Sequence, residues 1–107
     1  MSAGVTSSQR TAICFLNPGI TTDRAADERA MIELAARLGY DTDEPVIINP
    51  YRMGPYVTVM TAISEQRPAA VIVPDLDHVD GIDRYIRERV LLITVAGERV
   101  LERGAVA

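Results

Sequence analysis

Hydrophobic residues form four short runs, separated by longer stretches in which polar and apolar residues mix. The runs are rich in β-branched side chains and end in turn-forming residues, which is typical of β-strands. None alternates strictly with polar residues, as expected for strands that a parallel sheet buries on both faces. The predicted strands cover residues 11–16, 46–48, 69–73 and 90–95.

The stretches between the runs carry apolar residues at helical spacing. They predict one helix over about residues 23–38, capped by Thr22 or Asp23, a second that opens with Pro55, and a third over about 79–89. In the second helix, this spacing outweighs the low helix propensity of β-branched residues. The predicted stripes are Met31, Leu34, Ala35 and Leu38, then Tyr56, Val59, Met60 and Ile63, then Val79, Ile82, Tyr85 and Ile86.

Strands and helices that alternate predict an α/β fold. Right-handed crossovers make it a three-layer sandwich around a parallel four-stranded sheet. The 107 residues suffice for one hydrophobic core, so we expect a single domain over 11–107, preceded by a flexible tail over 1–10. The C-terminal segment after Gly97 is too short to assign to an element.

Composition and charge narrow the possible functions. The chain is 48% hydrophobic, and no apolar run reaches the roughly 20 residues of a membrane span. Its net charge of −4 disfavours autonomous DNA binding, and the arginines near the C-terminus interleave with acidic residues as on a solvated face. No secretory signal is visible, and the single cysteine, Cys14, lies in an apolar run. These features indicate a buried, inert thiol and a cytoplasmic protein.

Ligands of open parallel sheets bind outside the carboxyl ends of the strands, so the loops there hold the candidate site. The loop after the first strand places Gly19, Thr21, Thr22 and Asp23 at a helix start. Free N–H groups and the helix dipole favour an anion there. The same hydroxyl and carboxylate groups equally serve simple helix capping.

The loop after the third strand contains Asp75 and Asp77, which together could hold a hard divalent cation. A third acidic ligand is missing at the neighbouring strand ends, which carry Asn17 and Asn49. Capping and loop hydrogen bonds are the alternative role for the two aspartates. No cofactor is therefore expected.

Three further side chains are candidates for ligand binding. His78 is the only histidine and has no serine or cysteine relay beside it, so a hydrogen-bonded structural role is the simpler interpretation. Tyr51 and Arg52 follow the second strand and could recognise a partner or a phosphate, although such pairs are common on loops.

Two segments resemble a known family. The run AICFLNPGITTDRAADERAMIELAARLGYDTD resembles the opening of the serine recombinases (resolvases and invertases), where a strand leads through an Arg-Val-Ser-Thr-Asp loop into a helix that ends in glycine. The run AAVIVPDLDHVDGIDRYI is similar to their third strand and its Asp-Leu-Asp-Arg-Leu-x-Arg motif. The resemblance covers about residues 11–95 and implies a resolvase-like sheet with strand order 2-1-3-4.

In that family a serine hydroxyl attacks a phosphodiester, while arginines bind the phosphate and stabilise the transition state. Here Thr21 takes the place of the nucleophile, and Gly19 that of the arginine two residues before it. Asp77 is kept, whereas His78 and Gly81 replace two arginines. A threonine could in principle attack, but the loss of the arginines leaves little catalysis.

These replacements favour a catalytically silent recombinase-like domain that serves as a protein-interaction or regulatory module. One alternative is a protein or enzyme that binds a phosphate or nucleotide ligand with the strand-end loops, possibly with Mg²⁺. Another is recombination-associated DNA processing in which a partner supplies the DNA contacts. A protein partner or self-association through a helix face or the C-terminal tail is also expected, because Val100, Leu101 and Val106 have no predicted core position.

Overall fold

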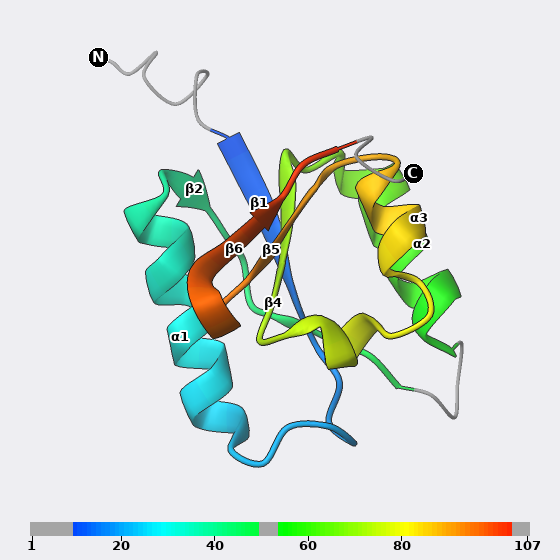
Figure 1. Ribbon diagram of the computed structural model, residues 1–107. Helices are drawn as coiled ribbons and strands as arrows, with labels where there is room; N and C mark the ends of the chain where they lie inside the picture. Colours follow the sequence, from blue (N-terminus) through cyan, green and yellow to red (C-terminus); the bar gives the residue numbers. More distant parts are fainter. Residues whose placement is uncertain (1–9, 50–53, 104–107) are drawn as a thin grey trace.

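The computed structural model describes residues 10–49 and 54–103. Within these residues, six strands form one sheet: β1 (Arg10–Leu16), β2 (Tyr40–Asp41), β3 (Val46–Ile47), β4 (Ala70–Val73), β5 (Leu91–Thr94) and β6 (Arg99–Leu101). The helices are α1 (Arg24–Arg37), α2 (Gly54–Gln66) and α3 (Asp83–Arg87), together with two 3₁₀ turns, η2 (Leu76–Val79) and η3 (Ala96–Glu98). The result is an α/β fold with a mostly parallel sheet (Figure 1).

The four predicted strands correspond to β1, β3, β4 and β5. Both β3 and β4 pair with β1 in parallel, and β5 pairs in parallel with β4, so these strands have the predicted neighbours. The prediction of a four-stranded, purely parallel sheet is wrong. β2 adds a short parallel pairing at the beginning of β1, and β6 runs antiparallel to β5.

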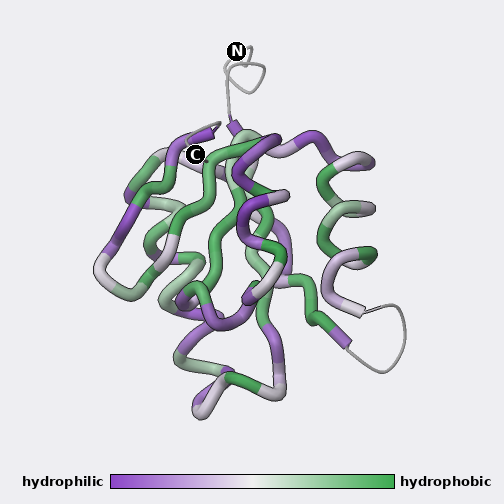
Figure 2. The backbone as a smooth tube through the Cα atoms, turned by 45° about the vertical axis from the view of Figure 1, so that its right-hand side comes forward, coloured by the Kyte–Doolittle hydropathy of each residue, from purple (hydrophilic) through white to green (hydrophobic). Residues whose placement is uncertain are grey.

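Helices cover both faces of the sheet. Because successive side chains of a strand point to opposite faces, β1 contributes to two separate hydrophobic clusters. Ile13 and Phe15 pack with residues of α2 and α3, whereas Cys14 and Leu16 pack with residues of α1. In Figure 2 the central strands carry mainly hydrophobic residues.

Helix α1 begins and ends close to the predicted residues. The Asp23 side chain caps it by accepting a hydrogen bond from the Ala26 N–H at 3.1 Å. Gly39 follows the helix at φ +86°, a conformation that glycine adopts without strain. Met31 and Leu34 are buried as predicted, whereas Leu38 is partly exposed.

Helix α2 forms despite its β-branched residues, because Val59 and Ile63 are buried against the sheet. Tyr56, which the spacing assigned to the same stripe, is instead 47% exposed. Its ring makes an edge-to-face contact with Tyr85 of α3, with the ring centroids 5.4 Å apart. The stripe that faces the core is therefore narrower than predicted.

The prediction of one continuous helix over 79–89 is wrong. The chain forms η2, then a turn, and then the five-residue α3. The extended backbone of Asp80 (ψ 132°) and the positive φ of Gly81 (+86°) interrupt the helix. Val79, Ile82 and Ile86 are buried all the same, so the apolar spacing identified the packing face but not the break.

The segment after Gly97, which the sequence left unassigned, forms β6. Gly97 and Glu98 both have positive φ and turn the chain back beside β5. Leu101, for which the sequence predicted no core position, packs against the core. Val100 is 49% exposed. Val106 lies outside the described residues.

The structure also tests the expectations for Cys14 and for a membrane-spanning segment. Cys14 is almost fully buried, and burial raises the pKa of its thiol to about 11, as expected for an inert cysteine. Across residues 10–49 and 54–103, no helix combines the length and the apolar character that crossing a bilayer requires.

Candidate functional site

A pocket of about 400 Å³ lies at the carboxyl ends of β1, β4 and β5. Its walls come from the loop after β1, the first turn of α1, the loop after β4 and the residues after β5. This is the position at which open parallel sheets bind ligands. Of the candidate residues, the pocket brings together Thr21, Thr22, Asp75, Asp77 and His78.

The loop after β1 is held by its own hydrogen bonds. The side-chain oxygen of Asn17 accepts a bond from the Gly19 N–H at 2.9 Å, and its backbone carbonyl accepts one from the Ile20 N–H at 3.0 Å. These bonds form a tight turn that places Thr21 at the mouth of the pocket, before the helix cap Asp23. The capping interpretation thus holds for Asp23.

The hydroxyl of Thr21 is engaged by a carboxylate. It donates a short hydrogen bond to Oδ2 of Asp27, in the first turn of α1, and its oxygen accepts a bond from the Asp23 N–H at 3.2 Å. Asp27 also lines the pocket. The sequence analysis missed Asp27, although an acidic residue in a first helical turn next to a loop of hydroxyls is a recognisable signal.

The loop after β4 supplies the opposite wall. Asp75 accepts a bond from the Asp77 N–H at 2.9 Å and thereby caps η2, which is the capping role weighed for it. His78 is 3% exposed, and its Nδ1 accepts a hydrogen bond from the Asn17 N–H at 2.9 Å. The histidine therefore ties the loop after β4 to the end of β1.

Burial lowers the pKa of His78, and the carboxylates of Asp75, Asp27 and Asp77 oppose this only in part. The hydrogen bond from the Asn17 N–H also favours the neutral imidazole, because Nδ1 can accept this bond only while it carries no hydrogen of its own. At neutral pH the imidazole is uncharged, with its proton on Nε2. A neutral histidine offers a phosphate one hydrogen bond and no charge.

The charge of the pocket is negative. Asp27, Asp75 and Asp77 contribute three carboxylates, and none of the described residues that line the pocket is a lysine or an arginine. Nor do His, Cys, Asp or Glu side chains of the described residues form a group of three that could hold a metal ion. The described walls therefore suit hydroxyl or cationic groups better than a phosphate.

The remaining candidates lie elsewhere. Gly19 and Gly81 are in turns and do not line the pocket, and Gly81 has φ +86°. A Cβ at Gly19 would meet nothing closer than the Asn17 side chain at 3.4 Å, so a larger residue fits there. Tyr51 and Arg52 lie outside the described residues.

Comparison with protein-family models, with curated proteins and with solved structures finds no match for this chain.

Proposed function

We propose that the chain is a catalytically silent serine-recombinase-like domain that acts in the cytoplasm as a protein-interaction module. The observation that carries the proposal is the state of the strand-end pocket. The Thr21 hydroxyl donates to Asp27, and the pocket around it holds three carboxylates and the buried His78, which stands where the family pattern has an arginine.

Phosphodiester chemistry needs positive charge where the transferring phosphoryl group gains negative charge. Loss of one well-placed donor already costs about 3–4 kcal/mol of transition-state stabilisation. Here several are replaced together, and the carboxylates Asp27, Asp75 and Asp77 repel a phosphate instead. Restoring the nucleophile alone leaves this deficit unchanged.

We therefore expect neither the natural chain nor Thr21→Ser to cleave DNA. The assay incubates each protein with supercoiled plasmid that carries candidate sites and quenches with denaturant to trap covalent adducts. An active serine recombinase with its own site serves as the positive control, and a thermal melt establishes that Thr21→Ser is folded. Adducts linked through residue 21 in either protein would overturn the proposal.

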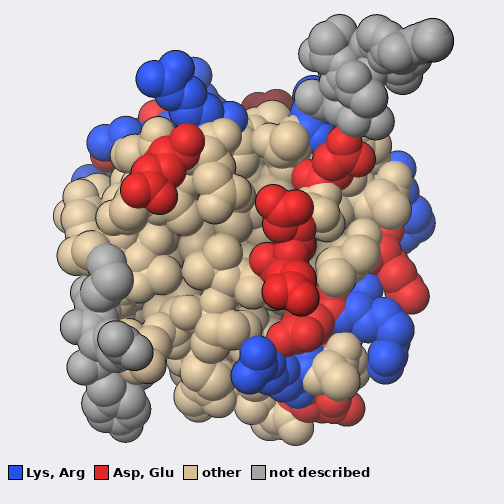
Figure 3. All heavy atoms as spheres, turned by 180° about the vertical axis from the view of Figure 1, so that it is seen from behind, with Lys and Arg blue, Asp and Glu red and all other residues tan. Residues whose placement is uncertain are grey.

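The interaction surface that we propose is the outer face of α2, and its partner a second copy of the chain. Helix α2 carries no charged residue before Glu65. Tyr56 and Val57 are 47% and 45% exposed on it and line, with Met60 and at its far end Glu65, a shallow hollow of about 420 Å³. In Figure 3 a broad uncharged surface lies between a mixed group of basic and acidic atoms at the upper left and a column of acidic atoms near the centre.

The proposed partner, a second copy of the chain, carries the same net charge. Two molecules of net charge −4 repel each other, and an uncharged face is where they can approach at the least electrostatic cost. Two such faces bury each other's tyrosine and valine side chains in an isologous contact. Strongly charged partners gain nothing from this surface.

Val57→Glu is expected to weaken self-association at least about tenfold, because it buries an unpaired carboxylate in the contact. Ile32→Glu is the matched control, since Ile32 is 42% exposed on α1, across the sheet. Sedimentation and light scattering over a concentration series measure the effect. A natural chain that is monomeric at every concentration, or an equal loss in both variants, would contradict this interface.

A further inference from the structure

Three arginines converge on a second pocket, of about 410 Å³, at the amino ends of β4 and β5. Arg67 follows α2, Arg89 lies between α3 and β5, and Arg103 follows β6. Because β6 runs antiparallel to β5, its end returns Arg103 to the edge of the sheet at which β5 begins. Three segments far apart in sequence thus place guanidinium groups around one hollow.

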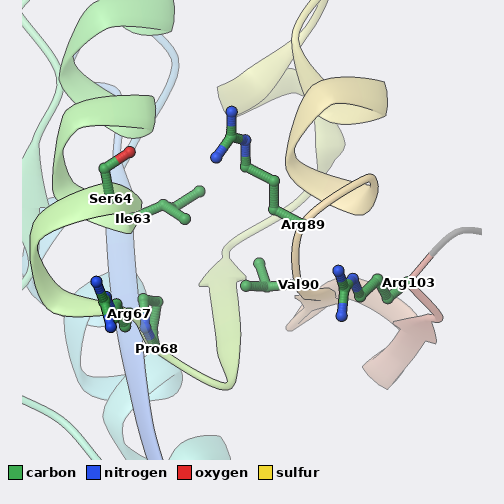
Figure 4. Close-up of a pocket in the computed structure, with 7 residues that line it drawn as sticks. All are labelled: Ile63, Ser64, Arg67, Pro68, Arg89, Val90 and Arg103. Atoms are coloured by element: carbon green, nitrogen blue, oxygen red, sulfur yellow. The ribbon is translucent and has the colours of Figure 1, made fainter.

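Figure 4 shows how the walls and the floor of this arginine pocket are built. Ser64 and Arg67 lie on the side of α2, while Arg89 and Arg103 lie on the opposite side. The Ser64 hydroxyl and the Arg89 side chain extend into the space between the two walls. The apolar floor consists of Ile63, Pro68 and Val90, all buried.

Among residues 10–49 and 54–103, no carboxylate pairs with the arginines of this pocket. The described residues show no ion pair of Arg67, Arg89 or Arg103, and no acidic residue is among those that line the pocket. Nε of Arg103 donates a hydrogen bond to the backbone carbonyl of Glu88 at 3.4 Å. The guanidinium groups keep donors for a ligand.

Interactions with helix ends explain part of the placement of the three arginines. A basic residue at a helix C-terminus interacts favourably with the helix dipole, which accounts for Arg67 after α2. Arg67 also has φ +49°, where glycine or asparagine is cheaper. Arg89 likewise follows the C-cap residue Glu88 of α3, and Arg103 donates to the Glu88 carbonyl, yet all three side chains face the same hollow.

We propose that this pocket binds a small phosphate-bearing ligand. The planar guanidinium groups match the oxygens of a phosphate in bidentate fashion. Ser64 adds a hydroxyl, and the apolar floor accepts a non-polar part of the ligand beside the phosphate. The volume lies within the usual range of small-molecule sites, about 300–1,000 Å³. The site is separate from the strand-end pocket, at the opposite end of the sheet.

Isothermal titration of the full chain with inorganic phosphate, pyrophosphate, phenyl phosphate and sulfate tests the proposal. We expect phenyl phosphate to bind more tightly than inorganic phosphate, because its ring packs on Ile63 and Val90. Tighter binding of pyrophosphate instead would identify an inorganic polyphosphate as the source of the phosphate. Either result supports a phosphate site. The affinity for sulfate serves as the reference for non-specific attraction of anions.

Arg89→Gln is expected to weaken phosphate binding about tenfold, since a charge-assisted hydrogen bond is lost. Arg67→Asn is expected to weaken it similarly while leaving the protein at least as stable, because asparagine tolerates a positive φ. Arg29→Gln is the control, an exposed arginine on α1 that should leave affinity unchanged.

Two results would overturn the phosphate site. One is no detectable binding of any phosphate probe at millimolar concentration. The other is an equal loss of affinity in Arg29→Gln and Arg89→Gln, which would indicate general attraction to basic surface. Ser64 borders both this pocket and the hollow on α2, but phosphate binding is read by titration and self-association by sedimentation, so failure of the phosphate site is distinguishable from failure of the proposed function.

Discussion

Phe15→Ala is expected to lower the free energy of unfolding by about 3–5 kcal/mol, the range for truncation of a fully buried aromatic side chain. Phe15 is 0% exposed, on a strand with partners on both sides, and packs in the cluster shared with α2 and α3. Removing its ring leaves a cavity between the sheet and two helices that cannot both move inward. The expected fall in Tm is more than about 10 °C.

Urea unfolding monitored by circular dichroism measures this effect, with the slope of the transition compared between variants. Ile32→Ala is the control, because Ile32 is exposed on α1 and its truncation should cost less than about 1 kcal/mol. A loss below 1 kcal/mol for Phe15→Ala would show that this cluster is not the core of the domain.

His78→Ala is expected to cost about 2–4 kcal/mol at neutral pH, from a lost buried ring and an unpaired backbone donor. The His78 ring is the acceptor for the Asn17 N–H, at the junction of β1 and the loop after β4. His78→Asn offers an acceptor oxygen in a similar position and should cost less than alanine. Chemical unfolding of the three proteins under one buffer condition gives the comparison.

The same residue gives the chain a pH dependence with a definite sign. Burial lowers the pKa of His78 in the folded state, whereas the unfolded chain keeps the ordinary value of 6.5. As the pH falls below 6.5, the unfolded state gains a proton that the folded state does not, so stability decreases toward acid. One such group contributes at most about 1.4 kcal/mol per pH unit.

We therefore expect the natural chain to lose stability between about pH 6.5 and 5 more steeply than His78→Asn, which cannot titrate. Parallel curves for the two proteins would contradict the lowered pKa.

Several parts of the fold were predictable because their sequence signals are local. The apolar runs identified β1, β3, β4 and β5, since strands buried on both faces carry few polar residues. The interruption at Gly81 was not predictable from spacing, because a 3₁₀ turn followed by a short helix buries the same Val79 and Ile86 as a continuous helix does.

Some residues of the candidate sites were likewise predictable from the sequence, and others were not. Thr21, Asp75 and His78 follow strands of a recognisable sheet, so their convergence was foreseeable from topology. Asp27 required the turn geometry that brings the first turn of α1 back to the loop. The arginine pocket depends on the antiparallel return of β6, a three-residue strand with little sequence signal, so its arginines read only as part of a charged surface.

The two borders of the sheet affect how the protein behaves at high concentration. On one side β1 is lined by β2 and β3, of two residues each, and on the other the sheet ends in β6, of three. Edges this short offer few unpaired backbone groups to a neighbouring molecule, which is how native sheets avoid templated, fibril-like growth. Concentrated samples should therefore remain free of ordered aggregates, and any assembly that forms should be finite and built by helices.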